Sequence, residues 1–291
     1  MGTPGNNRLF ASGIAIAGLV LLFPQNSQSA TVTVATNAVW NERVQQSKAE
    51  LAQEIANPEA FLSINIADTS KDQIASIDDL AQRSPQGSMV AIPSGLIHHW
   101  KGAVLIRDAR SSDVVTALQD YNSYTDIFRP AVIDSKLLSR TQDEFRYRLK
   151  MVQKGFGVKA GLLGVFRSNY YQLSASEGYS ITEAIELDEL ENAGASDERM
   201  IPFGASHGYV EKVFTIVRYR EAGRGVYVEI ETLTLSRGVP GPVRWMISPA
   251  IQRFSRQTMA GTLESVRDKV RATEELAASG ERPRSLEHGG W

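Results

Sequence analysis

Near residue 240 the apolar periodicity of this chain changes from about two residues to about 3.6. From Met89 to about residue 238, strand-like runs separated by turn residues dominate. After "RGVPGP" the apolar residues recur at helical spacing and form one stripe: Met259, Leu263, Val266 and Val270. A single amphipathic helix laid across the concave side of an antiparallel sheet can bury that side. The order of elements therefore predicts an α+β fold in which a long C-terminal helix covers a curved antiparallel sheet.

The other elements follow from the same reading of apolar spacing and turn residues. Residues 37–56 predict a helix, and residues 57–87 a polar linker with one short helix. "MVAIPSGLIHHWKGAVLIRD" predicts a strand pair interrupted at Pro93 and Gly95, and "SSDVVTALQDYNSYTDIF" a helix capped by Ser111 or Ser112. Strands are expected in "AVIDSKLLS", "DEFRYRLKMVQ", "VKAGLLGVFRSNYYQLS", "GYSITEAIELDEL" and a hairpin over 209–236. The C-terminal region predicts two helical pieces, with Ser255 as N-cap of the second.

The second strand of that hairpin, "GVYVEIETLTLSR", raises a question about its two glutamates. Because alternate strand residues share a face, Glu229 and Glu231 lie together with Tyr227 and two leucines. One register places Arg218 opposite Glu229, and a shift by one residue places Val217 there. With Arg218 opposite, the pair either lines a cavity and holds a ligand head group or forms a salt bridge on the solvated convex face. The sequence favours the solvated face.

The first thirty residues have the layout of a secretory signal peptide. After Arg8 comes the apolar run "LFASGIAIAGLVLLF", followed by Pro24 and "QNSQSA". The run is shorter than the roughly 20 apolar residues of a membrane span. We expect cleavage after Ser29 or Ala30 and an exported protein, periplasmic or extracellular, and the alternative is an uncleaved N-terminal anchor. The tail 274–291 has no apolar periodicity and is expected to be disordered.

Composition and motifs exclude several classes of function. The net charge of −2 provides no basic surface for nucleic acid, and a chain with no cysteine has no disulfide, thiolate nucleophile or cysteine metal site. His98 and His99 are adjacent in a strand and point to opposite faces, so they cannot chelate one ion. No serine with a recognisable paired base indicates a catalytic triad. We therefore predict no catalytic residues, no metal site and no cofactor.

Three segments carry a resemblance to a known superfamily. "TALQDYNSYTDIFRPAVIDSKLL", "EFRYRLKM" and "GVYVEIETLTLSRGVP" with the helix that follows resemble START-like (helix-grip) proteins, and more closely an exported bacterial group of unassigned function. The resemblance covers about residues 88–273. It implies a sheet of about seven antiparallel strands gripping the C-terminal helix around an apolar tunnel, and it implies no reaction, because this superfamily includes enzymes and carriers.

Together these observations predict non-catalytic binding or transport of a hydrophobic small molecule, lipid or isoprenoid-like, in an internal cavity. A transient membrane contact is compatible with this function, and the sequence identifies no protein partner. Arg218 and Glu229 would be the polar anchors if their pair faces the cavity. The other expected ligand-binding residues are Leu105, Phe145, Leu149, Phe166, Tyr170, Phe214, Leu233, Met246, Met259 and Leu263. The alternatives are a cyclase or hydratase-like enzyme that uses Tyr or Glu in the same cavity, and a protein-interaction module whose cavity is filled by side chains.

Overall fold

The computed structural model describes residues 32–62, 86–155, 158–202, 205–223, 225–237 and 241–279. In the long C-terminal helix it describes the side chains of residues 252–273. The predicted signal peptide, its cleavage sites, most of the linker and the end of the tail lie outside these ranges.

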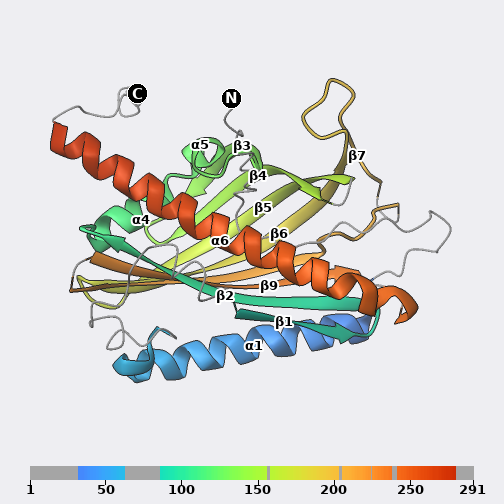
Figure 1. Cartoon of the computed structure of the whole chain (residues 1–291), viewed down its shortest axis with the longest axis horizontal. Helices are drawn as coiled ribbons and strands as arrows, with labels where there is room; N and C mark the ends of the chain where they lie inside the picture. Colours follow the sequence, from blue (N-terminus) through green and yellow to red (C-terminus); the bar gives the residue numbers. More distant parts are fainter. Residues whose placement is uncertain are drawn as a thin grey trace, which may run out of the picture.

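One antiparallel sheet organises the molecule (Figure 1). Eight of its strands form a continuous path in the order β1-β2-β9-β8-β6-β5-β4-β3, and the short β7 pairs with β6. The last strand of the chain therefore lies between the second strand and the β8 arm of its own hairpin. The strands are β1 Gln86–Ile92, β2 Gly95–Arg107, β3 Val132–Arg140, β4 Glu144–Gly155, β5 Val158–Gln172, β6 Glu177–Glu191, β7 Arg199–Met200, β8 Lys212–Ala222 and β9 Gly225–Arg237.

Helices precede, interrupt and follow the strands. Helix α1 comes first, the short helices near residue 120 connect β2 to β3, and α6 ends the described chain. Their bounds are α1 Val34–Ala56, η1 Pro58–Ala60, α4 Ser111–Gln119, η2 Tyr121–Ser123, α5 Tyr124–Ile127 and α6 Gly241–Ser279. Among the described residues, no helix combines the length and apolar character needed to cross a membrane.

Helix α6 crosses one face of the sheet, as Figure 1 shows. Its buried stripe packs into the main hydrophobic core and consists of Met259, Leu263, Val266 and Val270. The helix lies against β2 at Gly102, where an added Cβ would lie 3.0 Å from Met259 Cγ and 3.1 Å from Leu263 Cδ1. A side chain at that position would require these two side chains to shift by a few tenths of an ångström.

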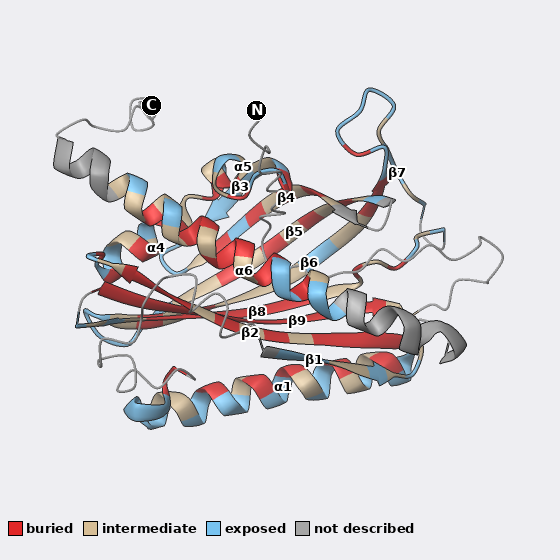
Figure 2. Ribbon diagram, in the orientation of Figure 1, coloured by how far each residue is buried: buried red, intermediate tan, exposed pale blue. Residues whose placement is uncertain are grey.

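Helix α1 packs on the opposite face of the same sheet. Thr33 caps its start, accepting a hydrogen bond from the Thr36 backbone N–H. Its buried side forms a second core against β2, β8 and β9, made of Trp40, Val44, Leu51, Ile97, Phe214, Ile216, Leu233 and Leu235. Strand β9 is therefore buried on both faces along nearly its whole length, under α6 on one side and α1 on the other (Figure 2).

The predicted fold class and the long C-terminal helix are confirmed, with three differences in detail. The sheet has nine strands instead of about seven. The helix predicted over 111–128 is broken into α4, η2 and α5. The two C-terminal pieces form one helix through Pro249 to Ser279, so Ser255 is not an N-cap but a fully buried residue facing the sheet.

Candidate functional site

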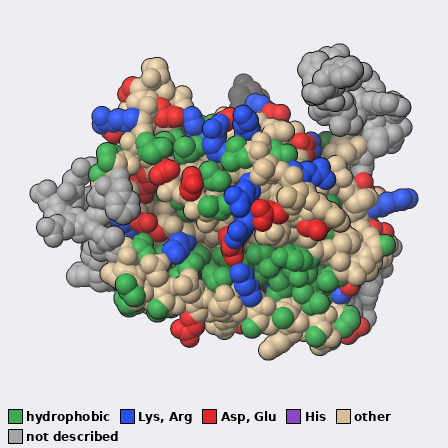
Figure 3. All heavy atoms as spheres, turned by 180° about the vertical axis from the view of Figure 1, so that it is seen from behind, with side chains coloured by type: hydrophobic (Ala, Val, Ile, Leu, Met, Phe, Trp, Pro, Cys, Tyr) green, Lys and Arg blue, Asp and Glu red, His purple; other side chains and the backbone are tan. Residues whose placement is uncertain are grey.

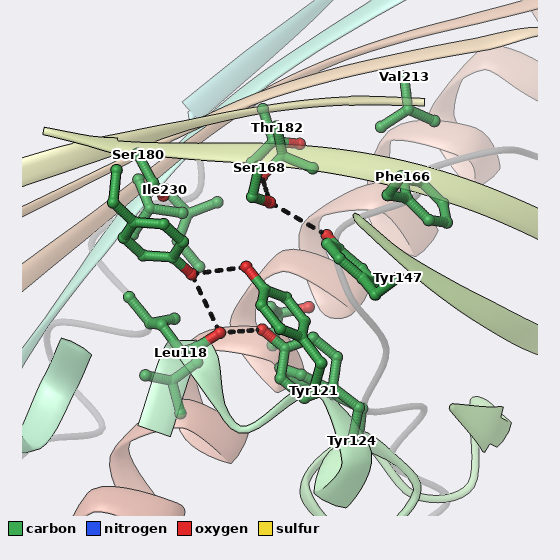
Figure 4. Close-up of a pocket in the computed structure, with 16 residues that line it drawn as sticks. Leu118, Tyr121, Tyr124, Tyr147, Phe166, Ser168, Ser180, Thr182, Val213 and Ile230 are labelled. Atoms are coloured by element: carbon green, nitrogen blue, oxygen red, sulfur yellow. Dashed lines mark hydrogen bonds between the residues drawn. The ribbon is translucent and has the colours of Figure 1, made fainter. Parts of the chain in front are cut away.

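A cavity of about 60 Å³ lies between α6 and the sheet (Figure 4). Its described walls come from α4 to α6 and from strands β4, β5, β6, β8 and β9, and none of these residues is charged. They are Leu118, Tyr121, Tyr124, Phe128, Tyr147, Phe166, Ser168, Tyr170, Ser180, Thr182, Val213, Thr215, Val217, Ile230, Thr262 and Val266.

Four tyrosines dominate one end of this cavity. The break between α4 and α5 places Tyr121 and Tyr124 side by side, and the Tyr121 ring stacks on Tyr147 at a centroid distance of 4.0 Å. The Tyr124 and Tyr170 hydroxyls both donate to the Leu118 carbonyl, at 2.5 and 3.1 Å. Tyr170 thereby uses its only hydroxyl proton, so Tyr121 donates to Tyr170 across 2.8 Å. The network fixes the rings around the cavity.

Hydroxyl groups on neighbouring strands form the other wall. Ser168 on β5 and Thr182 on β6 share a hydrogen bond of 2.5 Å, and Ser168 also donates to the Tyr147 hydroxyl at 3.4 Å. Thr215 on β8 bonds to Thr232 on β9 at 3.0 Å. Because these residues face the same side of the sheet, the cavity combines aromatic rings with neutral donors and acceptors.

Burial keeps the tyrosines protonated at neutral pH. It raises the pKa of Tyr147 to about 12, against weaker hydrogen bonds from Ser168 and Thr182 that act in the other direction. Desolvation also raises the pKa values of Tyr121, Tyr124 and Tyr170 well above the usual value near 10. The cavity therefore has neutral hydroxyls to offer a ligand and no tyrosinate base.

The charged residues of the central strands lie on the other face, beneath α1. Arg218 is fully buried and donates to Glu229 at 3.0 Å, to Glu231 at 3.1 Å and to Glu54 of α1 at 2.7 Å. Lys101 lies 3.2 Å from Glu231 and 3.8 Å from Glu54. Of the two possible registers, the one with Arg218 opposite Glu229 is present. The favoured position on the solvated face is wrong, because the pair is fully buried under helix α1 and lies neither in water nor in the cavity.

These contacts leave the pKa values of Glu54 and Glu231 shifted in opposite directions. Burial by itself would raise the pKa of Glu231, but His99, Lys101 and Arg218 outweigh it and lower that pKa to about 2. For Glu54, burial raises the pKa, and Arg218 and Lys101 offset only part of the increase. Glu231 is therefore the firmly ionised carboxylate, and Glu54 is the one that burial brings closer to protonation.

The face away from α6 also carries a more open hollow beside α1. It has a volume of about 350 Å³, and its walls include Trp40, Lys48, Glu183, Lys212 and Phe214. Figure 3 shows that face, with Lys and Arg beside Asp and Glu next to a patch of hydrophobic side chains. Its polar, charged walls contrast with the neutral cavity under α6.

The structure divides the predicted site residues between the two faces. Phe166 and Tyr170 line the cavity. Four more lie in the core around it without lining it: Phe145, Leu149, Met259 and Leu263. The side chain of Met246 lies outside the described residues. The expected cavity position is corrected for the remaining five, which lie on the α1 face: Leu105, Phe214, Arg218, Glu229 and Leu233.

The correction has a simple physical cause. In a strand with one solvated face, the apolar residues mark the side that faces the core. Strands β8 and β9 carry apolar residues on both sides and are buried on both, because a helix covers each face. The sequence analysis identifies none of the Ser and Thr residues of the hydroxyl wall, because these residues are common in strands. Their alternation was a usable signal, since Ser180 and Thr182, or Thr232 and Thr234, share one face.

Within the described ranges, no group of three or more His, Asp or Glu side chains is arranged to hold a metal ion. No protein-family model matches the chain, and no curated protein matches it.

Solved structures do show similarity. A STAR-related lipid transfer protein from Xanthomonas axonopodis has 18% identity and a TM-score of 0.42, covering 64% of this chain and 98% of its own. The Zhui aromatase/cyclase from a Streptomyces species has 16% identity and a TM-score of 0.41, covering 64% and 99%. A protein from Thermus thermophilus has 14% identity and a TM-score of 0.43, covering 60% and 98%. All three TM-scores lie below 0.5, and we take no family, ligand or activity from these similarities.

Proposed function

We propose that this protein binds an uncharged, largely apolar small molecule between the sheet and α6, without changing it covalently. The observation that supports this most directly is the segregation of polar groups. All described residues around the cavity are uncharged, while Arg218 and its carboxylates lie on the opposite face. Burying an unpaired ligand charge in such walls would be costly, so a neutral ligand fits best.

The size of the cavity adds a condition. Ligand pockets are usually about 300–1,000 Å³, and the 60 Å³ space admits only a small chemical group. A lipid-sized molecule therefore requires α6 to move relative to the sheet as it binds. The contact that must yield is the packing of Met259 and Leu263 on Gly102.

The alternatives draw less support from the site. An enzyme that needs a general base at the cavity would lack one among the described lining residues, because the tyrosines stay protonated and none of these residues is a carboxylate. The interaction module predicts a filled cavity. A chain that binds no small molecule, with α6 rigidly packed, would favour it.

The test uses a matched pair of probes, para-butylbenzyl alcohol and para-butylbenzoate, titrated at neutral pH and followed by calorimetry. We expect the alcohol to bind more tightly than the benzoate, because the site has no cation for the carboxylate. Val217→Phe places bulk in the cavity and should weaken binding of the alcohol, while Ile185→Phe, at a position 44% exposed on β6, should not. Tighter binding of the benzoate, or a Val217→Phe variant that binds as well as wild type, would contradict the proposal.

Export is part of the same proposal, because an apolar molecule that crosses an aqueous compartment needs a shielded carrier. We expect removal of the N-terminal apolar run near Ser29 or Ala30. Intact-mass measurement of material from the periplasm or medium tests it, and a full-length chain found only in the membrane fraction would favour the anchored form.

A further inference from the structure

Five buried polar atoms without a hydrogen-bond partner occur where α6 passes over β2 and β9. They belong to side chains that are at most 1% exposed, and no partner is found for them within the described structure. They are His98 Nδ1, Trp100 Nε1, Thr234 Oγ1, Ser255 Oγ and Thr258 Oγ1. Buried polar groups in folded proteins are nearly always bonded, so several orphans in one region require an explanation.

The register of the sheet brings these residues together. His98 lies directly opposite Thr234, and Trp100 is on the same face of β2 as His98 and Gly102. Gly102 touches Met259 and Leu263 of α6, and α6 runs in the same direction as β2 (Figure 1). Ser255 lies one turn, about 6 Å, before Met259, and Trp100 lies about 6.6 Å before Gly102. Ser255 and Thr258 therefore face the His98–Trp100 segment of β2 and its neighbour Thr234.

The chemistry of this cluster is neutral. Burial lowers the pKa of His98 to about 4, so its ring is uncharged at neutral pH, and its Nε2 pairs with the Ser236 hydroxyl at 2.8 Å. The Trp100 indole is a donor only, and the three hydroxyls both donate and accept. Such a set suits a hydroxyl or carbonyl oxygen, whereas an ion would lack a countercharge among these groups.

The cluster adjoins the tyrosine cavity. Thr262, one turn beyond Thr258, lines that cavity and donates back to the Thr258 carbonyl at 2.9 Å. A molecule that separates α6 from the sheet could therefore contact both places. We propose that the cluster of His98, Trp100, Thr234, Ser255 and Thr258 binds a neutral oxygen, hydroxyl or carbonyl, of the ligand whose apolar part enters the cavity. This inference rests on the proposed function and specifies its ligand as an oxygenated, uncharged apolar compound.

Replacing threonine by valine separates a ligand role from a structural one. Valine keeps the shape of threonine and removes the hydroxyl. Where the hydroxyl has no partner in the free protein, its removal should leave stability unchanged or raise it. If the same hydroxyl binds the ligand oxygen, its removal should lower ligand affinity without lowering the stability of the free protein.

The experiment compares para-butylbenzyl alcohol with butylbenzene, which has the same apolar body and no oxygen, in wild type, Thr234→Val and Thr258→Val. Thr273→Val is the matched control on α6, because its hydroxyl is already bonded to the Lys269 carbonyl away from the cluster. We expect each cluster variant to lose about three- to tenfold in affinity for the alcohol, the value of one neutral hydrogen bond. Butylbenzene affinity and the thermal midpoint should be kept, and the control should bind both probes as wild type does.

Three results would overturn the inference. One is a loss of stability in the Thr258→Val protein, which would give the hydroxyl a structural role. The others are an equal change in affinity for both probes, and no change in affinity for either. Both would mean that the cluster does not bind the ligand oxygen and that water satisfies its polar groups. Failure of wild type to bind either probe would instead remove the proposed function itself.

Discussion

The two faces of the sheet are made from the same strands, yet they bury opposite kinds of polar group. Toward α6, β9 presents valines, Ile230 and two threonines, and the polar groups there are neutral. Toward α1, the same strand presents Glu229 and Glu231, held by Arg218. The difference teaches that the charges are neutralised within the protein, whereas on the neutral face the hydroxyls of Thr234, Ser255 and Thr258 have no hydrogen-bond partner among the described residues. Substitutions on the two faces should therefore change the free energy of unfolding by different amounts and in different pH ranges.

The largest effect is expected on the charged face, from Arg218→Met. Removing this guanidinium leaves three carboxylates near one another with Lys101 as the remaining close cation. Loss of one member of a buried ion pair typically costs about 3–5 kcal/mol. Urea unfolding of wild type and variant measures it. A cost below about 1 kcal/mol would mean that α1 leaves the cluster accessible to water.

Next come two leucines, one on each covering helix. Leu263 of α6 and Leu51 of α1 are 2% and 3% exposed, so each Leu→Ala change should cost about 2–5 kcal/mol. The partly exposed neighbour Glu264 provides the control, and its change to Ala should cost about 0.5 kcal/mol or less. A small effect at Leu51 beside a large one at Leu263 would make α1 a loosely held cover, and the two faces would not be equivalent parts of the core.

The faces should also differ in their response to acid. The His98 pKa falls from 6.5 to about 4 on folding, so the unfolded chain binds the proton more readily. Its contribution is complete above pH 6.5 and is lost as the pH falls toward 4. At about 1.36 kcal/mol per pKa unit it amounts to roughly 3 kcal/mol. The pKa of Glu231 is lowered from 4.5 to about 2, so its contribution is present above pH 4.5 and is lost between 4.5 and 2.

Unfolding free energies measured from pH 7 to pH 4 cover the His98 window and only the upper end of the Glu231 window. The His98→Gln variant should lose less stability than wild type over that interval, because its side chain does not titrate. Parallel curves for the two proteins would show that His98 is solvated, and the neutral description of its surroundings would then fail.

The smallest effect is expected at the rim of the charged face. Lys48 pairs with Glu183 at 2.9 Å, but the two side chains are 35% and 32% exposed. A pair with that exposure is worth about 0–1 kcal/mol, so Lys48→Met should change unfolding little. A loss as large as that of Arg218→Met would show that the hollow beside α1 is much drier than its exposure indicates.

The sequence predicted the architecture well, because period-two runs and the helical stripe around Leu263 both depend on local spacing. The pairing of Arg218 with Glu229 was one of two registers compatible with the sequence. What the sequence could not provide was the position of helix α1 against the outer face of the sheet. Nothing in residues 34–56 indicated that Trp40 and Leu51 would seal the outer face, so Phe214 and Leu233 were assigned to the cavity. When a strand is buried on both sides, tertiary packing decides which side faces which helix. The local sequence pattern does not contain this information.

The position of β9 between β2 and β8 has a consequence for the order in which the molecule folds. The β8–β9 hairpin and the β3 to β6 meander form from neighbouring segments, but β2 must wait for a partner more than a hundred residues later, with Gly95 opposite Arg237. Closing so long a loop is slow, because its entropy is lost before the contacts form. Glu54 can reach Arg218 only once that hairpin exists. Helix α1, although it precedes the strands in the chain, should therefore be among the last elements to dock, and a chain stopped before residue 225 would leave the β1–β2 pair without β9.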